Sequence, residues 1–190
     1  MYMLRIGTWR SADSVDLVAC GWRDSGSGHG SGHVETGIKL IFAIGGRIPD
    51  FPGLRTGTRV ARGAEEIAGQ LRRGMDVVLI EPGSCPAAPV VAAGMWHYGW
   101  TLGDLGALAG ATVAGLALAA QPGPCAVEIC RDGRSSLDGH MSAAAVLALL
   151  ADRFSGGRYH TPEVTVPLES VRLSQEAPSR VLIAACAGSR

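Results

Sequence analysis

The stretch "RDGRSSLDGHMSAAAVLALLADRF", residues 131–154, contains Asp138 just ahead of a run of small and apolar residues. The segment 140–154 is apolar on almost every side, and Gly156 and Gly157 follow it. A helix that is apolar all round is normally buried on all sides, and glycine commonly ends a helix. The pattern predicts a long buried helix over 140–154, with Asp138 close to its start.

Two strand-like runs, 163–173 and 180–187, follow this helix with no helical segment between them. A short polar connection suits an antiparallel pair, because a parallel crossover needs a dozen or more residues. Pro167 would place the first of these strands at an edge or a bulge. The pattern predicts an α+β fold of the hotdog type, in which a curved antiparallel sheet wraps one long buried helix.

An open α/β sheet is the competing architecture. The segment 63–74 is amphipathic, with acids in its first turn, and the strand-like segment 76–81 follows it. The hotdog interpretation instead divides the chain near residues 94–100. It predicts a shortened or degenerate hotdog-like half over 1–95 and a C-terminal hotdog half over 96–190, which together form a shortened double hotdog.

Composition excludes several classes of protein. The 190 residues include 17 basic and 17 acidic side chains, so no positive excess exists to neutralise the phosphates of a nucleic acid. His97 and Asp104 interrupt the most apolar region, 85–120, and we expect no membrane span. The five cysteines form no CxxC pair, and early charges argue against a signal peptide. We therefore expect a soluble cytoplasmic protein with reduced thiols.

Three motifs between residues 98 and 179 resemble the C-terminal half of the dehydratase domains of modular polyketide synthases, which have a double hotdog fold. They are "GWTLGDLG" (99–106), "LDGHMS" (137–142) and "VPLESVRL" (166–173). A fourth stretch, "HVETGIKLIF" (33–42), partly matches the histidine motif of that family. The sequence departs from the family at several fixed positions, including Ser142 where that family has glutamine or histidine, so an inactive relative remains open.

The resemblance implies elimination of water from a β-hydroxyacyl thioester. Asp138 would be the acid, His33 the base, and Tyr98, Gly99 and Ser142 would bind the substrate. The acid would need an apolar pocket that raises its pKa towards the working pH. The resemblance implies no metal and no cofactor. Its implied partner is an acyl carrier protein or a CoA-linked acyl substrate, and a homodimer is compatible with it.

Other interpretations remain open. Asp138 also suits the N-cap of a helix, where its carboxylate would accept backbone N–H groups. A second interpretation is a non-catalytic hotdog module that only binds a ligand or forms a dimer. A third interpretation is an α/β hydrolase or transferase that uses Cys85 or Ser84 in the turn after the strand 76–81, and this one predicts a parallel sheet.

Overall fold

The computed structural model describes residues 2–10, 16–24, 38–43, 53–57, 59–81, 83–121, 123, 125–184 and 186–190. These ranges contain ten strands, four α-helices and one short 3₁₀ helix. In chain order they are β1 (Tyr2–Arg10), β2 (Asp16–Asp24), β3 (Ile38–Ala43), α1 (Ala64–Arg72), β4 (Val77–Ile80), α2 (Ala88–Tyr98), α3 (Leu105–Ala119), β5 (Cys125–Ile129), β6 (Ser135–Asp138), α4 (Ala143–Arg153), β7 (Arg158–His160), β8 (Thr165–Pro167), η1 (Leu168–Ser170), β9 (Leu173–Ala177) and β10 (Arg180–Ile183).

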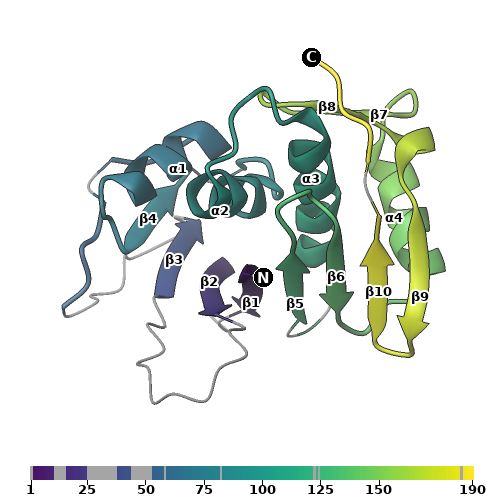
Figure 1. Cartoon of the computed structure of the whole chain (residues 1–190), viewed down its shortest axis with the longest axis horizontal. Coiled ribbons are helices and arrows are strands. Elements are labelled where there is room, and N and C mark those ends of the chain that lie inside the picture. Colours follow the sequence, from purple (N-terminus) through teal and green to yellow (C-terminus); the bar gives the residue numbers. More distant parts are fainter. Residues whose placement is uncertain are drawn as a thin grey trace.

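Eight strands form one sheet in the order β4-β3-β2-β1-β5-β6-β10-β9 (Figure 1). Neighbouring strands are antiparallel except β3 and β4, which run parallel. The predicted mixture of helices with an antiparallel sheet is confirmed. Strands β1–β4 come from the range 1–95 and the other four from 96–190, so both predicted halves contribute to the same sheet. The division into two domains stays a prediction.

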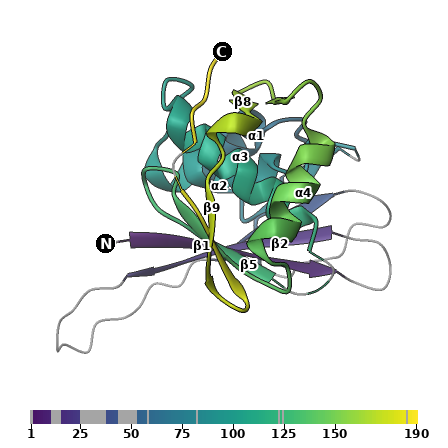
Figure 2. The ribbon, with the colours of Figure 1, turned by 90° about the vertical axis from the view of Figure 1, so that its right-hand side faces the viewer.

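The helices lie on one side of this sheet (Figure 2). Ile6 of β1 stands opposite Val127 of β5, and Leu137 and Val181 continue this row across β6 and β10. All four side chains are buried, and they face the helices. Because successive side chains of a strand point to opposite faces, their neighbours along each strand lie on the other face.

Helix α3 is the most completely buried helix of the described ranges. Every residue from Ala107 to Leu118 is buried. Glycines let its backbone approach other segments closely: a Cβ at Gly110 would lie 2.2 Å from the carbonyl oxygen of Gly133. A Cβ at Gly115 would lie 2.7 Å from the Cα of Ala87. The helix that is apolar all round is therefore this one, and it packs on the sheet between α2 and α4.

The prediction of a buried helix over 140–154 is wrong. Helix α4 occupies most of that segment, but it lies at the surface beside the edge of the sheet (Figure 1). Val146 and Leu150 are its buried residues, while Leu147 is 45% exposed. Three alanines precede Val146 in the helix, and their small side chains make the segment apolar in composition without requiring burial.

The N-cap of α4 is Ser142 and not Asp138. The Ser142 hydroxyl oxygen accepts a hydrogen bond from the backbone N–H of Ala145 at 3.2 Å. Asp138 instead ends β6, where it stands opposite Ala126 of β5 and Arg180 of β10. The interpretation of Asp138 as a helix cap is therefore wrong.

A separate two-stranded sheet, β7–β8, lies above the helix layer (Figure 2). Val164 and Val166 are buried and attach this hairpin to the core. Thr165 exchanges two backbone hydrogen bonds with Ser189, of 2.8 and 3.0 Å, so the end of the chain also holds the hairpin. Among the helices of the described ranges, none combines the length and the apolarity that crossing a bilayer requires.

Candidate functional site

The turn after β4 stands at the carboxyl end of a strand with parallel neighbours. Strand β3 pairs with β4 in parallel, and the bridges Thr56–Val77 and Ala61–Ile80 are parallel too. In α/β sheets, ligands bind outside the carboxyl ends of parallel strands, where loops and helix N-termini meet. The turn carries Cys85 and leads directly into α2. This is the part of the sheet whose geometry favours a binding site.

Cys85 contacts a tyrosine from a distant part of the chain. Its Sγ lies 3.5 Å from the hydroxyl oxygen of Tyr159, which belongs to β7. Both side chains are half-buried. The ring of Tyr159 also packs against Phe154, with the ring centroids 5.5 Å apart. The hairpin thus places a phenol beside the thiol.

The Tyr159 hydroxyl keeps its proton at neutral pH. Burial raises the pKa of Tyr159, and the hydrogen bond with Cys85 and the charge of the Cys85 thiolate raise it further, to about 12. Arg153 opposes these effects. Either atom can be the donor of this hydrogen bond while Cys85 is a thiol. Once the sulfur has lost its proton, only the Tyr159 hydroxyl can donate.

Glu163 fixes the same hairpin to the start of α1. Its carboxylate is buried, and Oε1 accepts a hydrogen bond from the backbone N–H of Ala64 at 2.9 Å. The N-cap residue of α1 is Gly63, which has no side chain to accept this bond. A carboxylate at a helix N-terminus is stabilised by the helix dipole. Glu163 therefore acts as the cap of a helix that lies about a hundred residues earlier in the chain.

The arrangement supplies a nucleophile and a proton donor. A cysteine sulfur attacks electrophilic carbon, and a phenol hydrogen-bonds to an oxygen or sulfur atom on which charge develops. Next to them, Ser84 donates its backbone N–H to the carbonyl of Glu81 at 3.1 Å, and Glu81 forms an exposed ion pair with Arg62 at 3.1 Å. No group of three metal-ligating side chains occurs among the described residues.

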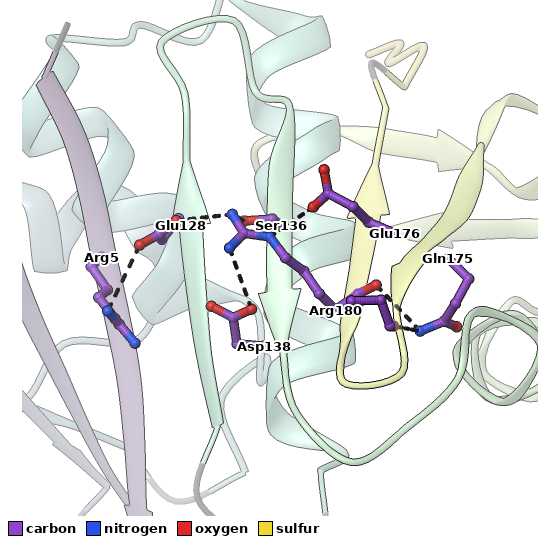
Figure 3. Close-up of polar contacts among 8 residues, drawn as sticks. Arg5, Glu128, Ser136, Asp138, Gln175, Glu176 and Arg180 are labelled. Carbon is purple, nitrogen blue, oxygen red and sulfur yellow. Dashed lines mark hydrogen bonds and ion pairs between the residues drawn. The ribbon is translucent and has the colours of Figure 1, made fainter.

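The structure places Asp138 on the sheet face opposite the helices (Figure 3). Its side chain is 34% exposed, and its carboxylate lies 3.7 Å from the guanidinium of Arg180. The predicted acid needed apolar surroundings, whereas this carboxylate stands in a group of charges. His33, the predicted base, lies outside the described residues. Catalysis by Asp138 and His33 stays a prediction.

Arg180 is the centre of that charged group, which we call the Arg180 cluster. Its guanidinium lies 3.3 Å from a carboxylate oxygen of Glu128 and 2.9 Å from one of Glu176, and it donates to Ser136 Oγ at 2.9 Å. Arg5 adds a further ion pair with Glu128 at 3.8 Å. Figure 3 shows these side chains meeting across β1, β5, β6, β10 and β9. The contacts join five strands, which is a structural role.

The predicted substrate-binding residues have contacts within the fold. The Tyr98 hydroxyl donates to the carbonyl of Ile129 at 2.5 Å, and its ring stacks on Trp100. Gly99 ends α2 with φ +72°, a left-handed conformation that favours glycine. These contacts join α2 to the end of β5, whereas Asp138 pairs with Ala126 at the start of β5. Ser142 caps α4, so the structure does not bring these residues together.

Sequence reasoning identified Cys85 and Ser84 as candidates but missed Tyr159 and Glu163. Both missed residues lie in "GRYHTPEV" (157–164), a stretch without a catalytic motif. The Cys85–Tyr159 contact spans 74 residues and the Glu163–Ala64 contact spans 99. Contacts of such long range leave no local pattern in the sequence. The signal that could have pointed to a site here is weak: a tyrosine and a glutamate in a polar turn next to a glycine.

Comparison with known families changes the interpretation of the sequence. A family model described as acyclic terpene utilisation family protein AtuA matches residues 58–121, about a third of the chain. No curated protein and no solved structure matches the chain. The predicted membership of the polyketide synthase dehydratases is therefore wrong. The matching family model is that of AtuA, and no match to a polyketide synthase dehydratase accompanies it. The chain is similar to the AtuA family over the segment that contains α1, β4, α2, α3 and the turn with Cys85.

Proposed function

We propose that this protein acts in the utilisation of acyclic terpenes and binds an acyclic terpenoid at the turn after β4. The observation that carries the proposal is the coincidence of two features. The family match covers residues 58–121, and the Cys85–Tyr159 pair stands at the carboxyl end of the parallel strand within that match. Cys85 and the turn that carries it therefore lie in the part of the chain that is similar to the terpene-utilisation family, while Tyr159 joins the site from outside that part.

The surroundings of the pair are largely apolar. Ala61, Ala87 and Ala88 are buried beside the turn, and Phe154 packs against the ring of Tyr159. Sites for small molecules are mostly apolar, with a few polar groups that fix orientation. In this proposal the hydroxyl of Tyr159 holds the oxygen of the terpenoid while apolar side chains contact its chain.

The pair also supports the hydrolase or transferase chemistry expected at Cys85. With an acyl ester or thioester, Sγ would add to the carbonyl carbon, Tyr159 would donate its proton to the leaving atom, and the thiol proton would restore the phenol. That interpretation predicted a parallel sheet, and this prediction is wrong for most of the sheet: among the described strands only β3 and β4, immediately before the turn, pair in parallel.

Calorimetric titration tests the proposed ligand. Geraniol, geranic acid and β-myrcene are an acyclic terpene alcohol, acid and hydrocarbon, and α-terpineol is a cyclic isomer of geraniol. We expect the purified protein to bind at least one acyclic compound at least about tenfold more tightly than α-terpineol, a difference of about 1.4 kcal/mol. Binding of none of the three, or equal binding of α-terpineol, contradicts the proposal.

Action on β-hydroxyacyl thioesters, carried by CoA or an acyl carrier protein, is a second proposal. It is favoured by a hotdog-like feature, since the buried helix α3 packs on antiparallel strands β5 and β6. A crotonyl-CoA hydration assay tests it with the variant Asp138→Asn. Hydration that the variant loses supports the proposal, and an absence of hydration or a rate that the variant leaves unchanged contradicts it.

A further inference from the structure

We propose that Tyr159 is the positioning residue of the Cys85 thiol, and that Glu163 holds Tyr159 in place by anchoring the β7–β8 hairpin. The inference rests on the proposed function only in taking Cys85 as part of the site. Tyr159 and Glu163 lie outside the segment that matches the AtuA family, yet they contact the turn after β4 and the start of α1 within it. The site then requires two segments that are remote in sequence.

Hydrogen bonds close the turn of the hairpin between Tyr159 and Glu163. The hydroxyl of Thr161 accepts hydrogen bonds from the backbone N–H groups of Glu163 and Val164, at 3.2 and 3.0 Å. The backbone N–H of Thr161 donates to the carbonyl of Val164 at 3.0 Å. Val164 is buried as well. The connection between Tyr159 and Glu163 is therefore a closed turn, so fixing Glu163 at Ala64 also fixes Tyr159.

The position of Tyr159 determines which group lies next to the sulfur of Cys85. Its hydroxyl lies 3.5 Å from Sγ and retains its proton at neutral pH. A donor next to sulfur stabilises the negative charge that sulfur carries when it attacks an electrophile. Removing the hydroxyl while keeping the ring should therefore slow the reaction of Cys85, and the ring contact with Phe154 should keep the hairpin packed.

Alkylation by iodoacetamide, followed cysteine by cysteine by peptide mass spectrometry, tests this effect. In the variant Tyr159→Phe we expect Cys85 to react about fivefold more slowly than in the unchanged protein. Cys130, a half-buried cysteine immediately after β5, is the internal reference and should react at an unchanged rate. A Cys85 rate equal to or faster than that of the unchanged protein overturns the positioning role.

Two substitutions of Glu163 form a matched pair that tests its anchoring role. Glu163→Ala removes the acceptor for the Ala64 N–H and should slow Cys85 alkylation as Tyr159→Phe does, whereas Glu163→Gln keeps an amide oxygen there and should restore the rate. The buried Cys125 and Cys186 report on unfolding, because their labelling rises if a variant loses the fold. Equal Cys85 rates in folded Glu163→Ala and Glu163→Gln proteins overturn the anchoring role. Alkylation needs no terpenoid, so this result is independent of the calorimetric test.

Discussion

Asp138 and Ser142 stand four residues apart, and the backbone assigns them different roles. An N-cap residue needs an extended conformation immediately before the first helical turn. Ser142 has φ −75° and ψ 162° and meets that requirement, while Asp138 is still paired within β6. The sequence pattern indicates Asp138 alone as the cap, because the sequence does not show that residue 138 is still paired within β6.

Replacing Ser142 tests its role as the cap. Ser142→Ala should lower the free energy of unfolding by about 1 kcal/mol, since it removes the acceptor for the Ala145 N–H. Ser142→Asn keeps an acceptor and should leave stability within a few tenths of that of the unchanged protein. Urea unfolding followed by circular dichroism measures both variants. Equal stabilities of the alanine and asparagine variants would refute the capping role.

The raised pKa of Tyr159 predicts a pH dependence of stability. A tyrosine that titrates near its usual pKa of 10.0 when unfolded and near 12 when folded binds more protons in the folded state between these values. Its contribution to stability is therefore complete below about pH 10 and is lost as the pH rises through about 12. The unchanged protein should lose more stability than Tyr159→Phe between about pH 9 and pH 11 in urea unfolding. Parallel losses in the two proteins would contradict the raised pKa.

Apolar runs do not distinguish a buried helix from a buried strand at the scale of single elements. The run "ATVAGLALAA" (111–120) reads as a strand by composition, yet it forms the second half of α3. By contrast, the amphipathic segment 63–74 and the strand 76–81 were predicted close to the observed α1 and β4. The difference is that α1 has a polar face that reveals its period, whereas α3 has none.

Two glycines of α3 test how closely that helix packs. Gly110→Ala would place a methyl group against the Gly133 backbone, so we expect a loss of about 2 kcal/mol or more. Gly106→Ala is the control in the same helix, because its nearest contact, the Cys186 carbonyl oxygen, would lie at 3.6 Å. That variant should be neutral or gain up to about 1 kcal/mol from helix propensity. Thermal unfolding of both variants would contradict this packing if Gly110→Ala were the more stable.

At the scale of the whole molecule, the described residues form a main sheet of eight strands that come from both halves of the chain. The sequence predicted antiparallel strands and the α+β class, and both are observed. It did not predict that β1 pairs with β5, because strand order depends on contacts between residues more than a hundred positions apart. The Cys85–Tyr159 contact was not predicted for the same reason. The two residues are far apart in the sequence, and only the folded chain shows that they are in contact.

The Arg180 cluster connects strands across this sheet. Arg180→Met keeps much of the aliphatic stem and removes the charge, leaving Glu128, Asp138 and Glu176 without their shared cation. We expect a loss of about 1–2 kcal/mol that shrinks in about 1 M NaCl, since salt screens partly exposed charges. Arg134→Gln removes an isolated exposed pair with Asp132 and should cost less than about 0.5 kcal/mol. Equal losses in the two variants would show that the cluster adds nothing to the sheet.

Protection of Cys85 by a ligand tests the central claim most directly. The protein is treated with iodoacetamide in the presence and absence of saturating geraniol, geranic acid or β-myrcene, and labelling of Cys85 and Cys130 is compared by peptide mass spectrometry. If an acyclic terpenoid binds at the turn after β4, at least one compound will slow labelling of Cys85 and leave Cys130 unchanged, whereas α-terpineol will have no effect. Labelling of Cys85 at its ligand-free rate with every acyclic compound would contradict the placement of the site.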